Sequence, residues 1–319
     1  MNYKNIVVIG AGILGSQIAF QTAYCGFNVT LLIRNKDSKD KIITRLNELK
    51  KTYIENIEKM SRNEIWSRGI ADPSNFNKEE CLEKINKIDE LIKIETNQKE
   101  ALKDADLVIE SITENIDAKI SLYKEIAPLL NEHTVIVTNS STILPSKLAK
   151  YTNREDKFLA LHFANHIWQN NTAEVMKHEK TNEIYFNEII EFAKKINMIP
   201  LPIQVEKSGY LLNSMLVPFL LSALDLYANG ISEPSAIDKA WKIGTGAPKG
   251  PFEIIDVVGL ITTRNIVEQY QKVPTIINPL LKKMMLPYNY KKMLDLLNKY
   301  IEEGKLGKAE KEGFYKYND

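Results

Sequence analysis

The sequence predicts an α/β fold in which a doubly wound parallel sheet is followed by an all-α domain. Short apolar runs rich in β-branched residues alternate with helical stretches through the first two thirds of the chain. This alternation is typical of parallel strands joined by right-handed crossover helices. A glycine-rich turn joins the first run to the first helix, and beyond Lys207 only helical patterns are found.

Length and composition agree with a globular protein of two domains. The chain has 319 residues, and domains of about 150 residues give about two of them. Hydrophobic residues make up 44% and charged residues 26%, and Lys+Arg 42 against Asp+Glu 41 gives a net charge of +1. This balance provides no reason to expect a nucleic-acid or membrane partner. Only Cys25 and Cys81 are present and the N-terminus lacks a signal peptide, so we expect a cytoplasmic protein.

The first elements form a strand-helix-strand unit. Residues 6–9 are β-branched and apolar and end at Gly10, which predicts a buried parallel strand. Residues 13–24 have a helical pattern that ends at Gly26, where a C′ glycine is common. Residues 29–33 form the second predicted strand.

A charged helical insert is predicted at about 36–100. It is dense in Lys, Glu, Asn and Ile, its apolar residues recur at helical spacing, and it is broken near Asp72-Pro73. A solvated helical hairpin is one interpretation. A cationic lip for a phosphate-bearing ligand is the other.

The remaining strands and helices place the domain boundary. We predict strands at 106–109, 134–137, 158–161 and 199–205, with helices at about 117–130 and 182–197. The sheet domain therefore covers residues 1–205 and the helical domain residues 206–319. The stretch 209–228 is apolar almost all round, but polar residues interrupt it, which favours a helix buried in the all-α domain or at a subunit interface over a membrane span.

The turn after the first strand matches a dinucleotide-binding fingerprint. Gly10-Ala11-Gly12-Ile13-Leu14-Gly15 fits G-x-G-x-x-G, follows a strand and opens a helix. Gly10 permits the tight turn, Gly12 lets the backbone approach a pyrophosphate, and Gly15 allows close helix–strand packing. This context predicts a Rossmann-type cofactor domain; a glycine-rich turn without a ligand is the alternative.

The end of the second strand departs from that fingerprint. An Asp or Glu usually holds the ribose 2′-hydroxyl there, but the chain has Ile33-Arg34-Asn35 and no acid until Asp37. Arg34 therefore argues for NADP(H), or at least against strict use of NAD(H). A surface arginine at a strand end is the open alternative.

Polar residues at the ends of later strands predict the catalytic centre. His162 follows one strand, Glu174 comes twelve residues later, and Ser141 follows the strand before. A histidine can give a proton to a carbonyl oxygen during hydride transfer, and a carboxylate behind it fixes its tautomer. Ser141 and Asn213 are candidates for polarising the carbonyl. His166 and His178 have no assigned role, and no metal site is expected because further ligands at suitable spacing are absent.

These motifs together resemble the 3-hydroxyacyl-CoA dehydrogenase family over nearly the whole chain. Besides the fingerprint and the His162–Glu174 pair, the resemblance rests on Leu107-Val-Ile-Glu110, Asn139-Ser-Ser-Thr142, Gly246-Ala-Pro-Lys-Gly-Pro-Phe-Glu253, Gly304-Lys-Leu-Gly307 and Gly313-Phe-Tyr-Lys-Tyr317. It implies an NAD(H)-binding first domain and a helical second domain that forms homodimers. It assigns general acid/base catalysis to His162, a partner role to Glu174, and substrate-carbonyl contacts to Ser141 and Asn213. The cofactor residues implied are Gly10, Gly12, Ile13, Leu14, Gly15, Glu110, Lys119 and Asn139, to which Arg34 is added.

Two positions are similar to a particular branch of the family. Ala164 and His166 stand where the family commonly has an aromatic residue and a proline, and the stretch 162–174 is closer to the branch that includes bacterial diketoreductase. That enzyme reduces a diketo ester without CoA. The leading hypothesis is a short-chain 3-hydroxyacyl-CoA dehydrogenase, such as one acting on 3-hydroxybutyryl-CoA. The alternatives are a diketoreductase-like or hydroxy-acid dehydrogenase that uses a β-keto ester or acid, and an inactive structural or binding protein of the same fold.

Overall fold

The computed structural model of the chain describes residues 3–271 and 288–317. The chain forms two compact units, Met1–Leu211 and Leu212–Asp319, and each is described by itself. The boundary expected after residue 205 lies in the segment that leads from the last strand to Leu211.

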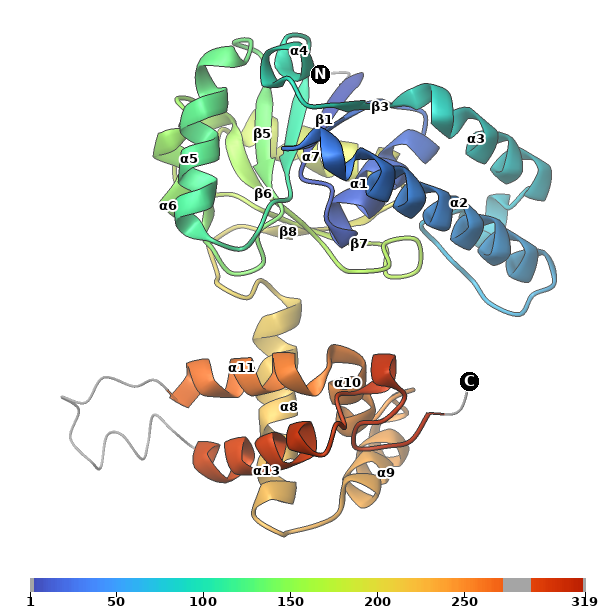
Figure 1. Cartoon of the computed structure of the whole chain (residues 1–319), viewed down its shortest axis with the longest axis vertical. Coiled ribbons are helices and arrows are strands. Elements are labelled where there is room, and N and C mark those ends of the chain that lie inside the picture. The colour runs from blue at the N-terminus through green and yellow to red at the C-terminus, as the bar shows by residue number, and fades with distance from the viewer. Residues whose placement is uncertain (1–2, 272–287, 318–319) are drawn as a thin grey trace. The chain divides into compact units, whose positions relative to one another are not determined.

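The first unit is built on one eight-stranded sheet (Figure 1). The strand order is β3-β2-β1-β4-β5-β6-β7-β8, so the order of the strands reverses between β1 and β4. All neighbours are parallel except β6 and β7, which are antiparallel. The strands are β1 (Asn5–Ile9), β2 (Asn28–Leu32), β3 (Ile92–Glu95), β4 (Leu107–Glu110), β5 (Val135–Thr138), β6 (Phe158–Phe163), β7 (Thr172–Met176) and β8 (Ile199–Ile203).

Helices cover both faces of this sheet. One hydrophobic cluster joins α1, α2, α3 and α7 to one face, and a second joins α4, α5 and α6 to the other. The alternation of side chains along β1 separates the two clusters, because Ile6 and Val8 belong to the first and Val7 and Ile9 to the second. The helices are α1 (Ile13–Tyr24), α2 (Lys39–Ser61), α3 (Lys78–Leu91), α4 (Gln98–Leu102), α5 (Ile116–Ile126), α6 (Pro145–Leu148) and α7 (Glu183–Lys195).

Two strands differ from the sequence prediction. The sequence predicted only parallel strands and none within 36–100 or 172–176, yet β3 lies in the insert, and β7 lies at Thr172–Met176 and runs antiparallel to β6. β3 is a four-residue edge strand whose charged residues continue the composition of α3. β7 contains Thr172 and Glu174 and so lacks the continuous apolar run expected of a buried strand.

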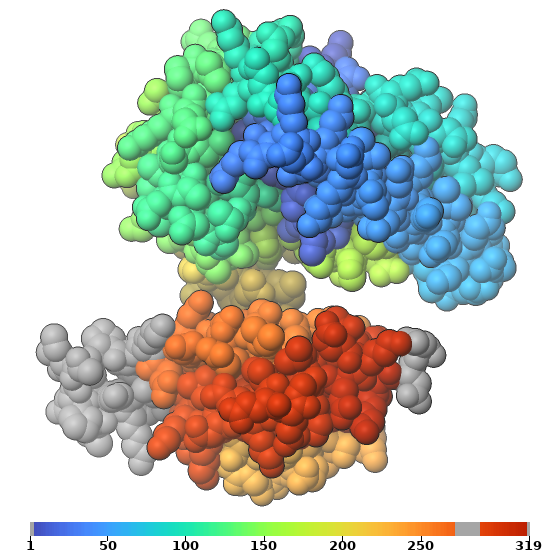
Figure 2. All heavy atoms as spheres, viewed as in Figure 1, coloured from blue at the N-terminus to red at the C-terminus, as the bar shows by residue number. Residues whose placement is uncertain are grey.

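The insert has α2 and α3 with a break between them. Asp72 caps the short 3₁₀ turn Pro73–Asn75 at this break by accepting from Ser74 N. α2 is fastened to α1 through Tyr53, which is fully buried and donates from its hydroxyl to Gln21 Oε1 at 2.5 Å. Figure 2 shows the surface of α2 and α3 at the side of the first unit.

The second unit is helical in its described residues, which comprise 212–271 and 288–317. Its helices are α8 (Leu212–Ala228), α9 (Pro234–Thr245), α10 (Pro251–Val258), α11 (Leu260–Gln271) and α13 (Tyr290–Glu302), and they share one hydrophobic cluster. α8 is not buried all round within the chain, because Met215 is 66% exposed although Leu224 is fully buried. Among the described residues no helix is long and apolar enough to cross a membrane.

Candidate active site

The turn between β1 and α1 requires glycine at two positions and leaves open space at a third. Gly10 has φ of +103°, and a Cβ there would lie 2.5 Å from the carbonyl oxygen of Ser111. A Cβ on Gly15 would overlap the carbonyl oxygen of Gly10, so α1 can approach β1 only with glycine there. A Cβ on Gly12 would meet nothing within 4 Å. The Gly12 backbone is therefore open to a ligand, as close approach of a pyrophosphate requires.

A cavity of about 820 Å³ begins at this turn. It is lined by residues at the carboxyl ends of β1, β2 and β4, the strands beside the reversal of strand order. Gly10, Gly12 and Arg34 line it as the sequence predicted, and Ile13 beside them is 65% exposed although apolar. The open glycine turn at a helix N-terminus and the size of the cavity fit a dinucleotide.

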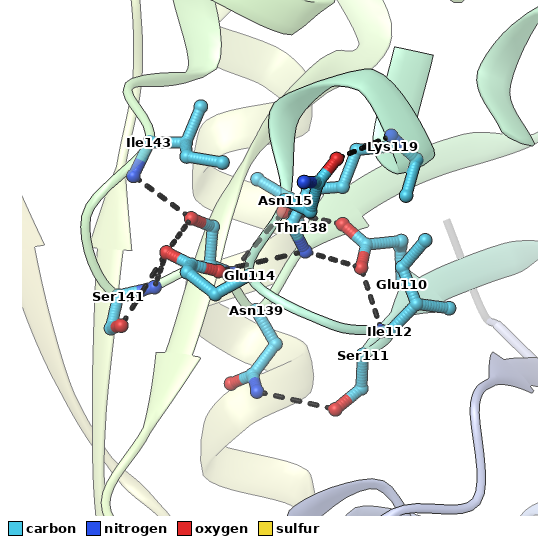
Figure 3. Close-up of polar contacts among 12 residues, drawn as sticks. Glu110, Ser111, Ile112, Glu114, Asn115, Lys119, Thr138, Asn139, Ser141 and Ile143 are labelled. Carbon is cyan, nitrogen blue, oxygen red and sulfur yellow. Dashed lines mark hydrogen bonds and ion pairs between the residues drawn. The ribbon is translucent and has the colours of Figure 1, made fainter. Parts of the chain in front are cut away.

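Glu110 and Lys119 lie behind the wall of this cavity. Lys119 Nζ is 2.6 Å from Glu110 Oε1, and both side chains are at most 1% exposed. Glu110 also accepts from Tyr123 Oη at 2.8 Å, Thr138 Oγ1 at 2.7 Å and the backbone N–H of Ile112 at 2.8 Å. Neither residue can touch a ligand directly in this conformation. Together they fix the segment after β4, whose Ile112 lines the cavity (Figure 3).

Asn139, at the end of β5, links three strand ends. Its Oδ1 accepts from the backbone N–H of Phe163 at 3.0 Å, and its Nδ2 donates to Ser111 Oγ at 3.3 Å. Since Ser111 lines the cavity and Phe163 follows His162 in β6, Asn139 connects the cofactor side of the sheet edge to the catalytic side.

His162 and Glu174 form the pair that the sequence predicted, and the sheet explains why. His162 lies within β6 and is directly opposite Glu174 on β7 in the antiparallel register. Opposite residues in such a ladder place their side chains on the same face. His162 Nδ1 is 2.9 Å from Glu174 Oε2, and the side chains are 14% and 6% exposed. Strand pairing thus brings His162 and Glu174 together although they are twelve residues apart in the sequence.

The second oxygen of Glu174 and the ring of Tyr210 hold this pair in place. Glu174 Oε1 accepts from the backbone N–H of Leu211 at 2.8 Å. The Tyr210 ring lies 4.8 Å from the His162 ring between centroids, and its hydroxyl donates to the carbonyl oxygen of Ser140 at 2.6 Å. With Nδ1 on the carboxylate, Nε2 is the nitrogen left to exchange a proton with a substrate.

Glu114 is a site residue that the sequence interpretation missed. Glu114 lies in the segment after β4, and its side chain extends to the loop after β5 that contains Ser141 (Figure 3). Its Oε1 accepts from Ser140 Oγ at 2.6 Å, from the backbone N–H groups of Ser141 and Thr142 at 3.1 and 2.8 Å, and from Thr142 Oγ1 at 2.7 Å. An acid shortly after a predicted strand, on the edge where His162 was expected, was the available signal.

Charge and hydrogen bonds keep Glu114 ionised. Burial alone would raise the pKa of Glu114, but the hydrogen bonds from Ser140 and Thr142 and the charge of Lys119 outweigh it, so the pKa lies below its ordinary value of 4.5. Lys119 Nζ is 3.7 Å from Glu114 Oε2. Lys119 therefore lies between two carboxylates, Glu110 and Glu114, and connects the two networks.

Comparisons with known proteins place this site in a family. The sequence profile described as "3-hydroxyacyl-CoA dehydrogenase, NAD binding domain" matches residues 5–207, and "3-hydroxyacyl-CoA dehydrogenase, C-terminal domain" matches residues 209–317. The chain belongs to the 3-hydroxyacyl-CoA dehydrogenase family. This confirms the resemblance and the Rossmann-type sheet domain followed by a helical domain.

Relatives of the 3-hydroxyacyl-CoA dehydrogenase family match along nearly the whole chain. Human "Hydroxyacyl-coenzyme A dehydrogenase, mitochondrial" is 32% identical over 314 residues, which are 98% of this chain and 91% of the relative. The "3-hydroxybutyryl-CoA dehydrogenase" of Clostridioides difficile is 29% identical over 317 residues, 98% and 99% of the two chains. A solved structure described as "Substrate-directed dual catalysis of dicarbonyl compounds by diketoreductase" is 43% identical with a TM-score of 0.83 and covers 99% of this chain and 100% of its own.

Membership of the 3-hydroxyacyl-CoA dehydrogenase family makes the protein an oxidoreductase of the type that acts on CH–OH groups, with an NAD(H)-binding first unit. The structure brings Ser141, His162 and Glu174 to one edge of the sheet. Asn213 lies in the first turn of α8 in the second unit, so its meeting with the other three remains a prediction. No cluster of three or more His, Cys, Asp or Glu that could hold a metal is found in the described parts of the chain.

Proposed function

We propose that the protein catalyses reversible hydride transfer between a nicotinamide cofactor and C3 of a 3-hydroxyacyl or 3-ketoacyl substrate. The observation that carries this proposal is the His162–Glu174 pair, which lies on the same sheet edge as the dinucleotide cavity. The relatives named "3-hydroxybutyryl-CoA dehydrogenase" in Clostridioides difficile and "Probable 3-hydroxybutyryl-CoA dehydrogenase" in Bacillus subtilis favour a short-chain CoA thioester such as 3-hydroxybutyryl-CoA.

His162 is the proton carrier in this proposal. In the oxidation direction its Nε2 takes the proton of the 3-hydroxyl as the C3–H bond breaks, and C3 becomes a carbonyl. When bound, the nicotinamide supplies or accepts the hydride. Glu174 holds the tautomer of His162 and stabilises the imidazolium that forms. In the reduction direction the imidazolium returns the proton to the carbonyl oxygen.

Ser141 and Asn213 are proposed to hold the substrate oxygen. Donors aimed at the C3 oxygen stabilise the negative charge that develops there during hydride transfer. Glu114 supports this role for Ser141 because it fixes the backbone on both sides of the hydroxyl. For Asn213, its place at the N-terminal end of α8 and its match to the family's motif support the proposal.

A second candidate is the same chemistry on a β-keto ester or acid without CoA. It is favoured by the 43% identity to a structure described as diketoreductase. The loop after His162 also has His166 where the family commonly has a proline, and the backbone of His166 has φ of +58°, which a proline cannot adopt. The side chain of Gln17 on α1 holds this loop by accepting from the backbone N–H of His166 at 2.9 Å.

A side-by-side assay of acetoacetyl-CoA and a free β-keto ester separates these candidates. With NADH or NADPH as the reductant, we expect a higher kcat/KM for acetoacetyl-CoA than for the ester. A tenfold ratio of the two kcat/KM values corresponds to a difference of about 1.4 kcal/mol in transition-state binding. Preference for the ester would favour the second candidate. Turnover of neither would contradict the proposal and leave an inactive binding protein.

We also propose that the protein acts as a homodimer in the cytoplasm. Large apolar side chains on the helical unit are exposed in the single chain, including Met215 at 66% and Ile243 at 83%. Such exposure is typical of a surface that a second copy covers. Free Cys25 and Cys81 fit a reducing compartment.

A further inference from the structure

The end of β2 lacks the group that selects NAD(H). In dinucleotide-binding sheets a carboxylate at this point binds the ribose 2′-hydroxyl and repels a 2′-phosphate. Here the position is taken by Ile33, which is 5% exposed and donates from its backbone N–H to the carbonyl oxygen of Glu95 at 2.9 Å. An apolar side chain can neither bind a 2′-hydroxyl nor repel a phosphate.

Cations line the cavity next to this point. Arg34 follows β2, and Lys41 and Arg45 lie in the first two turns of α2. The guanidinium of Arg45 donates to the carbonyl oxygen of Ala11 and so is already engaged with the glycine turn. Within the described residues, the side chains of Arg34 and Lys41 form no hydrogen bond or ion pair. These two charges are therefore available to a ligand in the cavity.

Acidic residues do not neutralise this part of the cavity. Glu125 on α5 is the one carboxylate among the described lining residues, and it accepts from Gln98 Nε2 at 3.3 Å and from Ser121 Oγ at 3.1 Å. Asp37 and Asp40 are near in sequence but do not line the cavity. Ser38 does line it, and its hydroxyl makes no capping hydrogen bond to α2. Among the described lining residues, Arg34 and Lys41 thus present two unpaired cations, and Ser38 presents a hydroxyl, beside the apolar Ile33.

We propose that Arg34, Lys41 and Ser38 form a binding site for the 2′-phosphate of NADP(H), so that the cavity takes NADP(H) as well as NAD(H) and binds NADP(H) more tightly. A guanidinium matches phosphate oxygens in a bidentate manner, an ammonium adds a point charge, and a hydroxyl adds a donor. The inference rests on the proposed function only in that the cavity holds a nicotinamide dinucleotide.

Calorimetric titration of the full-length protein with 2′,5′-ADP and with 5′-AMP isolates the 2′-phosphate without any turnover. We expect 2′,5′-ADP to bind at least about tenfold more tightly, as one charge-assisted contact would provide. The difference should shrink as salt is raised, because exposed charges are screened. Arg34→Ala and Lys41→Ala should each remove most of the difference and leave binding of 5′-AMP within about twofold.

Lys36→Ala is the matched control, since Lys36 is an exposed cation in the same segment that does not line the cavity. Its 2′,5′-ADP affinity should equal that of the wild type. Equal affinity of the wild type for the two nucleotides, or an equal loss in all three variants, would overturn the inference while leaving the proposed function intact. Failure to bind either nucleotide, NADH or NADPH would overturn both, and normal binding with no turnover of any keto substrate would contradict the proposed function alone.

Discussion

At the scale of single residues, three carboxylates organise the site by the same means. Glu110, Glu114 and Glu174 each bind a functional or buried side chain and also accept a backbone N–H from a segment that carries the site. Glu110 holds Ile112 and Glu174 holds Leu211 in this way. A charged acceptor for backbone N–H groups is worth more than a neutral one. Loss of charge at any of them should therefore displace a loop as well as remove a contact.

Glu114→Gln tests this positioning role. The amide keeps the size of the side chain but loses the charge that holds Ser140, Ser141 and Thr142, so we expect the free energy of unfolding to fall by about 1–3 kcal/mol. We expect kcat to fall at least about tenfold with nucleotide affinity unchanged, because Ser141 is displaced. Glu132→Gln, an exposed carboxylate, is the control for stability. An unchanged kcat in Glu114→Gln would contradict the role.

The contribution of the Glu114 carboxylate to stability should also depend on pH. The pKa of Glu114 is lowered in the folded protein, so its stabilising contribution is complete above its ordinary pKa of 4.5 and is lost as the pH falls through the lower folded value. As the pH is lowered, the free energy of unfolding should therefore fall less steeply in Glu114→Gln than in the wild type. Parallel curves for the two proteins would contradict this assignment.

Residues of the site that belong to a local motif could be predicted from the sequence, whereas residues brought together by strand pairing could not. Gly10, Gly12 and Gly15 fall within one short motif, and His162 and Glu174 match a family pattern, so the sequence could predict both sets. Glu114 and Ser141 are 27 residues apart and meet only because β4 and β5 are neighbours in the sheet. The sequence shows an acid shortly after a predicted strand, but it does not show which loop that acid contacts.

At the level of elements, Gly12 and Gly15 in the segment that joins β1 to α1 differ in what surrounds them. A Cβ on Gly15 would collide with the carbonyl oxygen of Gly10, whereas a Cβ on Gly12 would enter open space, which we propose is filled by a bound pyrophosphate. The direction of β7 is also a property of elements, and the sequence could not predict it. β7 runs antiparallel so that Glu174 pairs with His162, and its direction is set by its connection and partner rather than by its composition.

Gly15→Ala should therefore lower stability, whereas Gly12→Ala should abolish nucleotide binding. In Gly15→Ala the added methyl group overlaps the carbonyl oxygen of Gly10, so α1 must shift and the free energy of unfolding should fall by about 1–3 kcal/mol. In Gly12→Ala stability should stay within about 0.5 kcal/mol, while nucleotide binding is lost because the methyl group fills the space for the pyrophosphate. Urea unfolding and calorimetry measure the two effects, and a stable, non-binding Gly15→Ala would contradict the assignment.

At the level of the whole molecule, each unit has its own hydrophobic core, and each exposes some large apolar side chains. The sheet unit buries its strands between two layers of helices, as the sequence predicted. The helical unit leaves apolar residues of α8 and α9 exposed, and the sequence had favoured a first helix buried in the all-α domain or at a subunit interface. The proposed homodimer would cover these side chains.

Ile243→Asp tests the proposed dimer. Ile243, in α9, is 83% exposed in the single chain, and a charge buried in an interface would be costly. We expect the wild type to sediment as a dimer and Ile243→Asp to shift toward the monomer. Val205→Asp is the matched control, because Val205 is an apolar residue of the first unit that is 79% exposed. A monomeric wild type would contradict the proposal.

The kcat of His162→Gln with NADH or NADPH and a 3-keto substrate shows whether His162 transfers the proton during hydride transfer. General acid–base catalysis contributes about 10²- to 10⁴-fold, so kcat should fall by that factor. Nucleotide affinity should stay within about twofold, because His162 does not line the dinucleotide cavity. A kcat near that of the wild type would contradict the account.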